Sequence, residues 1–397
     1  MKVLLVRPAA SGGLAAHVDH ELALLTAAGW DVAEAPVRIA ERPHPREDLR
    51  TLRMLRSLLR EADTRTTLHA HGLRAGALAA LARGRRRAGP RSGPGPHRVV
   101  VTLHNRTVGS RATRLIGAAL LRILARRADT VLAVSPDLLQ AARQAGARDV
   151  RHAVIPAPGA AECGRAAGST APPKDPAPAP RPQVAPGAAP VAPGAAPAVP
   201  GAAPVAPGAT DGSASGGPLE ILVVARLAPQ KGLHDLLDAS ALLREQIQQG
   251  LVAPVRIRIA GDGPLHAELD ARIRAERLPV ELLGRRSDVP ALLAATDLVV
   301  SAARWEGQPV SLQEALQAGA PIVATDAGGT RWVTGAAAAL VPVGDSSALA
   351  AAITAMHSPE ARRAARAASR RRAAELPTAE DLLAQLGVVL APGPRDW

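Results

Sequence analysis

The stretch "LEILVVARLAPQKGLHDLL", residues 219–237, decides the fold class of this chain. Its first seven residues form an apolar run that is typical of a buried parallel strand. A turn that contains Pro229 and Gly232 follows, and the pattern after Lys231 predicts a helix. A strand that leads through a short turn into a helix is the repeating unit of a parallel α/β sheet.

The same alternation of strand and helix patterns extends on both sides of an unusual central segment. A helix is predicted over about 14–28, and further strands are predicted at 2–6, 65–71, 97–104, 129–135, 255–261, 279–284, 297–302 and 320–326. These patterns indicate an α/β protein with two Rossmann-like domains joined by a linker. In such domains, ligands bind beyond the carboxyl ends of the strands.

The central segment divides the chain. The sequence "VAPGAAP" occurs at 184–190 and again at 191–197, and the prolines of each copy exclude a helix despite the heptad spacing. We therefore predict an N-terminal domain over 1–156, a disordered Pro/Ala/Gly-rich linker over 157–218 and a C-terminal domain over 219–356. A helical tail over 357–397, with helices near 359–375 and 378–389, is expected to cross back to the first domain.

Composition excludes several classes of protein. Phe and Tyr are absent, which we interpret as avoidance of A/T-rich codons, so aliphatic side chains and alanine must fill the cores. Cys163 is the sole cysteine and lies in the predicted linker, which excludes a disulfide within the chain and a cysteine-rich metal site. The apolar run at the N-terminus is too short for a signal peptide, and no run reaches the roughly twenty apolar residues of a spanning helix. We expect a cytoplasmic protein.

A formal net charge of +13 favours polyanionic partners, namely nucleic acid, anionic lipid or phosphorylated small molecules. The arginines are dispersed and have no interleaved aromatic residues, so we expect no nucleic-acid partner. Two interpretations of the helix predicted over 111–129 stay open. The favoured one is a core-facing helix with a charged outer surface. The other is a basic amphipathic helix that rests on an anionic membrane surface.

Two cations follow the strand at 219–225. Arg226 and Lys231 are five residues apart around a proline-containing turn, and both can converge on one point above the strand end, as a clamp for a diphosphate should. Lys231 is one of only three lysines among 48 Lys and Arg residues. The alternative is a plain surface cation near a helix start, where the helix dipole makes a cation mildly unfavourable.

Further unusual residues follow other strand ends. The loop "GDGPL" at 261–265 opens a helix, an arrangement common in backbone cradles for anions. Glu306 lies in the loop after the strand at 297–302, and Glu314 lies within the helix that begins near Pro309. Carboxylates accept hydrogen bonds from sugar hydroxyls. On spacing alone, a solvated helix face explains Glu314 equally well.

The first domain offers a weaker pattern. Gly12 and Gly13 follow the first strand, where glycines allow close approach of a ligand but also form plain turns. His104 and Asn105 stand at the end of the strand at 97–104, although a lone histidine is more often structural than catalytic.

Together these motifs resemble the retaining GT-B glycosyltransferases of family four, the "group 1" transferases related to glycogen and sucrose synthases. They stand in the expected order: Gly12-Gly13, "HAHG" (69–72), "TLHN" (102–105), "AVSPDLL" (133–139), "VIP" (154–156), "RLAPQKG" (226–232), "GDGP" (261–264) and the Glu-x7-Glu segment with "GAPIVATDAGG" (319–329). The resemblance covers roughly 1–156 and 219–350, and the C-terminal half is the more specific part.

The resemblance implies an enzyme that transfers a sugar from a nucleotide-diphosphate sugar with retention. Arg226 and Lys231 would neutralise the diphosphate, Glu306 would bind hydroxyls of the sugar, Glu314 the ribose, and His104 would lie beside the sugar. The catalytic set is Arg226, Lys231, Glu306 and His104; the donor-binding set is Gly12, Gly13, Gly261, Asp262, Gly263, Leu283, Gly307, Gln308, Pro309, Val310 and Glu314. No Asp-x-Asp occurs in the chain, which fits a metal-independent enzyme with no cofactor. The acceptor, which in many relatives is lipid-linked, stays unidentified.

Departures from the family pattern put the sugar in doubt. The Glu-Gly-Phe-Gly of many relatives is "EGQP" (306–309) here, and Trp332 replaces an acidic residue in "GGTRW" (328–332). A catalytically inactive scaffold that binds nucleotide or sugar is therefore the alternative, although the retention of Arg226, Lys231 and Glu306 argues against a decayed site. A nucleic-acid-binding protein is supported by charge alone.

Overall fold

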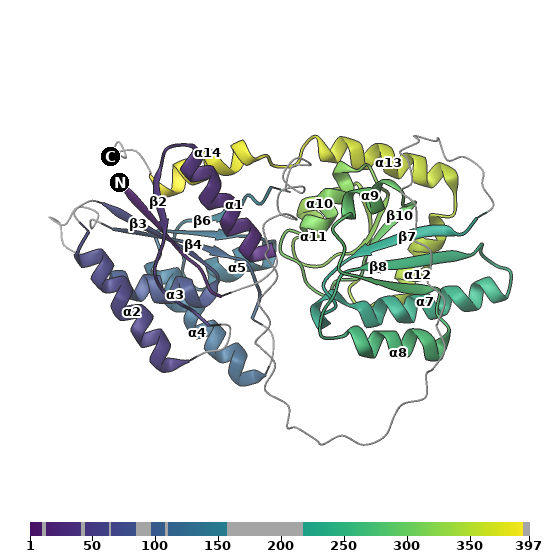
Figure 1. Ribbon diagram of the computed structural model, residues 1–397, viewed down its shortest axis with the longest axis horizontal. Helices are drawn as coiled ribbons and strands as arrows, with labels where there is room; N and C mark the ends of the chain where they lie inside the picture. The colour runs from purple at the N-terminus through teal and green to yellow at the C-terminus, as the bar shows by residue number, and fades with distance from the viewer. Residues whose placement is uncertain are drawn as a thin grey trace, which may run out of the picture.

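The computed structural model describes residues 1–9, 13–40, 44–62, 65–84, 97–107, 110–156 and 217–391. Two parallel six-stranded sheets, each covered by helices on both faces, lie side by side (Figure 1), which confirms the predicted fold class of two Rossmann-like domains. The predicted donor residue Gly12 lies outside the described residues. Of the predicted linker, only residues 217 and 218 are described.

The first sheet has the strand order β2-β1-β3-β4-β5-β6. Its strands are β1 (Lys2–Val6), β2 (Asp31–Glu34), β3 (Thr66–His71), β4 (Arg98–Leu103), β5 (Thr130–Ala133) and β6 (Val150–His152). The helices are α1 (Gly13–Ala27), α2 (Pro45–Arg60), α3 (Leu73–Arg83), α4 (Arg111–Arg127) and α5 (Pro136–Gln144). Helices α2, α3 and α4 pack side by side, while α1 packs against the final helix of the chain.

The second sheet has the order β12-β11-β10-β7-β8-β9. Its strands are β7 (Leu219–Val224), β8 (Val255–Ala260), β9 (Val280–Gly284), β10 (Leu298–Ser301), β11 (Ile322–Thr325) and β12 (Ala338–Val341). The short helix η1 (Pro229–Lys231) precedes α7 (Leu233–Gln248). The others are α8 (His266–Glu276), α9 (Val289–Ala294), α10 (Val310–Gln317), α11 (Thr330–Thr334), α12 (Ser346–Ala355), α13 (Pro359–Ala373) and α14 (Ala379–Leu390).

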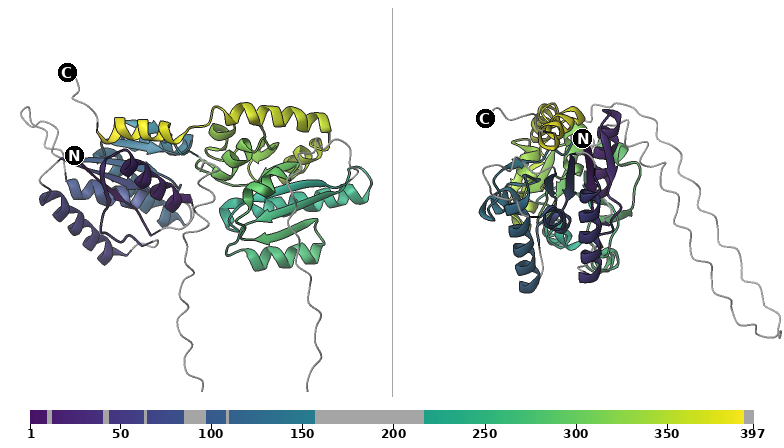
Figure 2. Two further views of the ribbon diagram at one scale, coloured as in Figure 1. Left: turned by 45° about the horizontal axis from the view of Figure 1, so that its top comes forward. Right: turned by 90° about the vertical axis from the view of Figure 1, so that its left-hand side faces the viewer.

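The last two helices belong to different domains (Figure 2). Helix α13 packs against α10 of the second domain. Helix α14 begins with a capping box of Thr378 and Asp381, and it buries Leu382, Leu386 and Val389 in the hydrophobic core of the first sheet. The hydroxyl of Thr67 on β3 donates to the carbonyl of Leu390 at 3.0 Å. Helix α14, the last described helix, therefore lies on the first domain.

The structure differs from the sequence-based expectation at helix α4. The interpretation as a core-facing helix is wrong for its first half, because residues 111–116 are all exposed, with Leu115 at 66% and Ile116 at 55%. Only Gly117, Leu124 and Ala125 of this helix are buried. No helix among the described residues is long and apolar enough to cross a bilayer.

Candidate functional site

Lys231 and Glu306 form an ion pair at the carboxyl edge of the second sheet. The Lys231 ammonium lies 2.5 Å from Glu306 Oε1, with the two side chains 23% and 12% exposed. Lys231 ends the turn after β7, and Glu306 follows β10, the strand that pairs with β7. Both side chains line a small pocket together with Ser301 and Ser311. Two residues that are 75 positions apart therefore meet where parallel sheets bind ligands.

A second ion pair holds these two loops together. The Arg304 guanidinium donates two hydrogen bonds to the buried carboxylate of Asp235 on α7, at 2.9 and 2.8 Å. These hydrogen bonds to Asp235 raise the pKa of Arg304. Gly232, which follows Lys231 in the turn, has φ +61°, and a Cβ on this residue would lie 1.9 Å from the Ala302 carbonyl oxygen in the loop after β10. The turn after β7 is thus clamped to the loop after β10, which fixes Lys231 relative to Glu306.

Arg226 is an exposed residue two positions after β7, in the same connection between β7 and α7 that carries Lys231. Among the described residues, no carboxylate forms an ion pair with its guanidinium. Among the described residues, Arg226 is therefore a cation without a carboxylate partner, in the same turn as the paired Lys231. Such an arrangement suits an anionic ligand that brings its own negative charge.

Close backbone packing explains why glycines occupy the "GDGP" loop. A Cβ on Gly261 would lie 1.9 Å from the Ala225 carbonyl oxygen, and one on Gly263 would lie 2.5 Å from that of Leu227. The carboxylate of Asp262 is exposed and accepts from the Gly263 amide at 2.7 Å. Leu283 on β9 is half-buried against a core cluster of the second domain. These glycines let the loop pack closely onto the turn that carries Arg226.

Glu314 lies in the second turn of α10 and is half-buried. Burial raises the pKa of its carboxyl. Within the described part of the chain, no donor or cation pairs with this side chain. A half-buried carboxylate without a protein partner is available to accept hydrogen bonds from a ligand.

The loop that carries Glu306 lies against the first domain. Gly329 donates its amide to the Glu306 carbonyl at 2.9 Å, and Gly328, with φ +57°, leaves no room for a Cβ beside that same oxygen. A Cβ on Gly307 would lie 2.6 Å from Val134 Cγ2 and 3.4 Å from the carbonyl oxygen of His104. The backbone of His104 in the first domain therefore lies close to Gly307, the residue after Glu306.

Several predicted donor residues make contacts between the domains instead. The Gln308 amide donates to the Ala153 carbonyl, and it lies 3.0 Å from His152 Nε2. Val310 at the start of α10 packs against the first domain's core, and Pro309 is buried just before it. The Trp305 indole N–H donates to Asp137 at 2.9 Å.

Gly13, a predicted donor residue of the first domain, is the first residue of α1 and is exposed.

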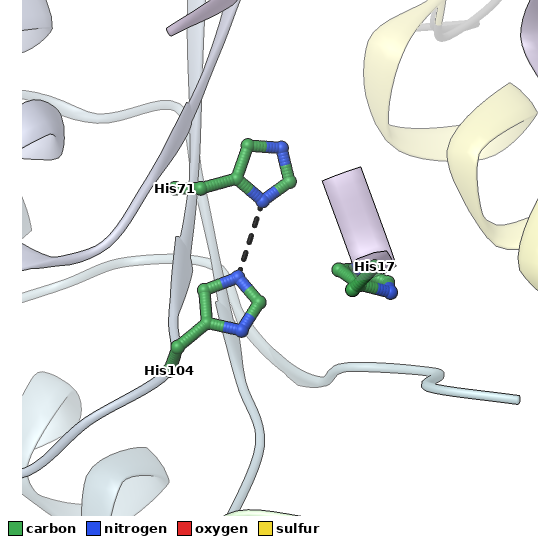
Figure 3. A group of neighbouring side chains, drawn as sticks. All are labelled: His17, His71 and His104. Atoms are coloured by element: carbon green, nitrogen blue, oxygen red, sulfur yellow. Dashed lines mark hydrogen bonds between the residues drawn. The ribbon is translucent and has the colours of Figure 1, made fainter. Parts of the chain in front are cut away.

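His104 belongs to a buried network that the sequence did not predict. His71 Nδ1 lies 3.1 Å from His104 Nε2, and the ring of His17 completes a group of three imidazoles (Figure 3). Behind them, Glu21 accepts from His69 Nδ1 at 2.6 Å, and His69 Nε2 lies 2.8 Å from the Thr102 hydroxyl.

Burial decides the charge state of these imidazoles. It lowers the pKa of His17 to about 4, where the charge of Glu21 opposes the shift only in part. Burial, with the charge of neighbouring histidines, also holds the pKa values of His71 and His104 well below their usual range. All three rings are therefore neutral at pH 7.

Local sequence patterns could have indicated parts of this network. His17 and Glu21 are four residues apart on one helix, and His69 and His71 are two residues apart on one strand, so the members of each pair share a face. The sequence gives no sign that these two faces meet. The ion pair of Asp235 and Arg304 was also missed, because a charged pair 69 residues apart leaves no local pattern.

Comparison with known proteins identifies the family. Residues 218–358 match the family described as "Glycosyl transferases group 1", and residues 3–158 match the "Glycosyl transferase 4-like domain". Together the two matches cover more than half of the chain. The chain belongs to the group 1 glycosyltransferase family with the GT-B fold.

Relatives of this group 1 chain come from bacterial polysaccharide synthesis. WcaL of Salmonella typhimurium, assigned to colanic acid biosynthesis as a glycosyltransferase, is 35% identical over 157 residues, which is 35% of this chain and 36% of WcaL. The UDP-Gal:α-D-GlcNAc-diphosphoundecaprenol α-1,3-galactosyltransferase of Escherichia coli is 31% identical over 110 residues, 27% of this chain and 28% of that protein. The matches thus span about a third of the relatives' own length.

Solved structures support the fold. The structure of Anabaena Alr3699/HepE in complex with UDP and glucose aligns over 98% of this chain and 100% of that chain, with a TM-score of 0.63 and 19% sequence identity. At this identity, the likeness shows the GT-B fold alone.

Proposed function

We propose that this protein transfers a sugar from a nucleotide-diphosphate sugar to an acceptor, with retention of the anomeric configuration. The observation that carries the proposal is the contact between Lys231 and Glu306, 2.5 Å apart at the carboxyl edge of the second sheet, where the exposed Arg226 stands in the same connection as Lys231. One site then offers cations for a diphosphate and a carboxylate for sugar hydroxyls.

In the reaction, the bond between the anomeric carbon and the diphosphate oxygen breaks, and a bond to the acceptor oxygen forms on the same face. The acceptor proton passes to the departing diphosphate, so the protein needs no general base of its own. Negative charge grows on the leaving group as its bond breaks. Lys231 and Arg226, held in advance at the strand end, would stabilise that charge, and no metal ion is required for this role.

The remaining roles follow from position. Glu306, once Lys231 turns to the diphosphate, would accept hydrogen bonds from hydroxyls of the donor sugar. Glu314, half-buried and without a partner among the described residues, would accept hydrogen bonds from the ribose. His104, close to Gly307 across the interdomain contact, would lie beside the sugar. The glycines of residues 261–263 would line the donor's surroundings through backbone alone.

The donor and the product of transfer test the proposal. Purified protein should release nucleoside diphosphate from one member of a panel of UDP-, GDP- and ADP-sugars, and UDP-sugars are the first choice because a relative is named for UDP-Gal. The configuration of the transferred sugar, measured by NMR coupling constants, should match the donor's. Binding of a nucleotide without any turnover would instead support the scaffold alternative, and an inverted product would contradict retention.

We further propose that the acceptor is reached at an anionic membrane surface through helix α4. Leu115 and Ile116 are exposed there, and Arg111, Arg114 and Arg122 surround them without an ion pair among the described residues. Apolar side chains within a basic helix face match a bilayer with anionic headgroups. A relative's name includes a diphosphoundecaprenol acceptor, a lipid.

Vesicle sedimentation tests this contact. The protein should bind vesicles that contain phosphatidylglycerol and not vesicles of phosphatidylcholine alone. The double substitution Leu115→Glu and Ile116→Glu should weaken binding at least about 10-fold, because two apolar side chains lose their burial. Leu251→Glu, at a leucine of the second domain that is 69% exposed, is the matched control and should leave binding unchanged. Equal binding by all three proteins would contradict the proposal.

A further inference from the structure

Three histidines from separate elements face one another at the carboxyl edge of the first sheet (Figure 3). His17 comes from α1, His71 ends β3, and His104 follows β4. The ring centroids of His17 and His71 are 5.9 Å apart, and each lies 5.4 Å from that of His104. We propose that His17, His71 and His104 form a binding site for a divalent transition-metal ion, with Zn²⁺ as the best match.

The distances suit such an ion. With Zn–N bonds of about 2 Å in a tetrahedral site, ligand nitrogens lie about 3.4 Å apart and ring centroids about 5 Å apart. His71 Nδ1 and His104 Nε2 are 3.1 Å apart, and one nitrogen of each of the three rings lies within 4.8 Å of the other two. Small side-chain rotations therefore suffice to bring three nitrogens onto one ion.

Glu21 stands in the place of an outer carboxylate. Histidines that bind a metal usually donate their other N–H to a carboxylate or carbonyl group. Glu21 Oε2 lies 3.6 Å from His71 Nε2 and 3.8 Å from His17 Nε2. Both Glu21 Oε2 and His71 Nε2 are buried and have no hydrogen-bond partner among the described residues. These two unsatisfied atoms are those that a metal-bound His71 would bring together.

The protons can be arranged without adding charge to the imidazoles. Without a metal, one proton is shared between His71 Nδ1 and His104 Nε2. With a metal, both nitrogens offer lone pairs, and the proton of His71 resides on Nε2, where it faces Glu21. The other oxygen of Glu21 is already held by His69, so the carboxylate is fixed in position. Metal binding thus requires a change of tautomer and no new charged side chain.

The ligand type selects the class of metal. Three imidazoles suit Zn²⁺, Cu²⁺ or Ni²⁺, whereas Mg²⁺ and Ca²⁺ prefer oxygen ligands. Three protein ligands leave a fourth position for water or another group.

Metal binding and the proposed transfer would compete for one residue, and this consequence rests on the proposed function. The backbone carbonyl of His104 lies close to Gly307, which follows Glu306, and His104 is the residue that we propose beside the donor sugar. An ion held by His104 takes its Nε2 away from the sugar. Zn²⁺ should therefore inhibit transfer, although the transfer step itself needs no metal.

A metal titration tests the site without any sugar donor. Full-length protein, first stripped with EDTA and then freed of it, should bind one tight Zn²⁺ in competition with a chromophoric chelator. Bound Co²⁺ should give the visible absorption of a tetrahedral site. His17→Gln should weaken Zn²⁺ binding at least about 100-fold, and Glu21→Gln about 10- to 100-fold. His266→Gln, at an exposed histidine of α8, is the matched control and should bind as the wild type does.

Circular dichroism establishes that each variant is folded. His17 lies on a helix near the edge of the network, so His17→Gln is the variant to interpret if Glu21→Gln unfolds. Absence of Zn²⁺ binding tighter than about 100 μM, or wild-type affinity in folded His17→Gln, would overturn the proposal. Zn²⁺ binding that is lost in His17→Gln, in a protein that cleaves no donor, would leave the metal site standing and refute the proposed function instead.

Discussion

The carboxyl edges of the two sheets carry polar side chains in opposite charge states. The second sheet presents a cation and a carboxylate, Lys231 and Glu306, which stay partly exposed and neutralise each other. The first sheet presents His17, His71 and His104, which are buried and neutral. Charge is kept where a charged ligand is expected to enter, and it is lost where imidazoles lie against each other and against the second domain.

Among the substitutions that test this difference between the two sheets, one at Glu306 should have the largest effect on activity. Glu306→Gln should lower donor turnover about 100-fold or more, because the amide is a weaker acceptor for sugar hydroxyls than a carboxylate and leaves Lys231 without a counter-charge. Binding of the free nucleotide should change less than about 3-fold, since Glu306 is placed at the sugar. Steady-state kinetics and isothermal titration measure the two quantities. Glu268→Gln, at an exposed glutamate of α8, is the control, and equal turnover in both variants would remove Glu306 from the site.

Gly232 tests whether the clamp between the two loops matters. A Cβ there would meet the Ala302 carbonyl oxygen at 1.9 Å, whereas Gly250, with a similar φ of +73°, has nothing within 4 Å of a Cβ. Gly250→Ala should cost about 1 kcal/mol of unfolding free energy from backbone strain alone. Gly232→Ala should cost more than about 2 kcal/mol and also reduce turnover, because Lys231 moves with the turn. Equal costs in the two variants would show that the close approach is not required.

Acid should affect the first domain through its histidines. In unfolded protein a histidine titrates near pH 6.5, whereas His17 in the folded protein titrates near pH 4. Between these values the unfolded state binds more protons, so the stabilisation is present above pH 6.5 and is lost as the pH falls towards 4. We expect a loss on the order of 2 kcal/mol.

Hydrogen exchange resolved by peptide, in buffer with EDTA, measures this effect in each domain. Peptides from β3 and β4 should lose protection between pH 6.5 and 4 more than those from β7 and β10. His17→Gln should reduce that loss, while His266→Gln should not. An equal loss of protection in both sheets would contradict the assignment to the buried histidines.

The sequence predicted the two Rossmann-like sheets because buried parallel strands appear as apolar runs. It did not predict β2, β6 and β12. Strands β2 and β6 are short and contain charged residues, and β12 is an apolar run of only four residues that continues a stretch of alanines. The strand-end positions of Lys231 and Glu306 were also readable, since each lies in the connection that follows a strand. The contact between them and the clamp of Asp235 and Arg304 depend on the order of strands in the sheet, which no local pattern contains.

The candidate site of the first domain was harder to predict from the sequence for the same reason. Of its histidines, only His104 was a candidate, because the neighbours that give it a role come from α1 and β3, far away in sequence. The exposed face of α4 was misjudged, since amphipathic patterns do not reveal whether a helix extends beyond the sheet that it covers. The expectation that the transfer needs no metal and no cofactor stays a prediction. It rested on the absence of Asp-x-Asp, a motif that carries no information about histidines gathered from three elements.

The central claim is that Lys231 stabilises a departing diphosphate opposite Glu306. Release of nucleoside diphosphate from the best donor, measured in EDTA for wild type, Lys231→Arg and Lys231→Ala, tests it most directly. We predict that Lys231→Ala loses about 100-fold or more in kcat, and that Lys231→Arg retains part of the activity because it keeps the charge in a less compact form. Turnover by folded Lys231→Ala within about 3-fold of the wild type would contradict the account.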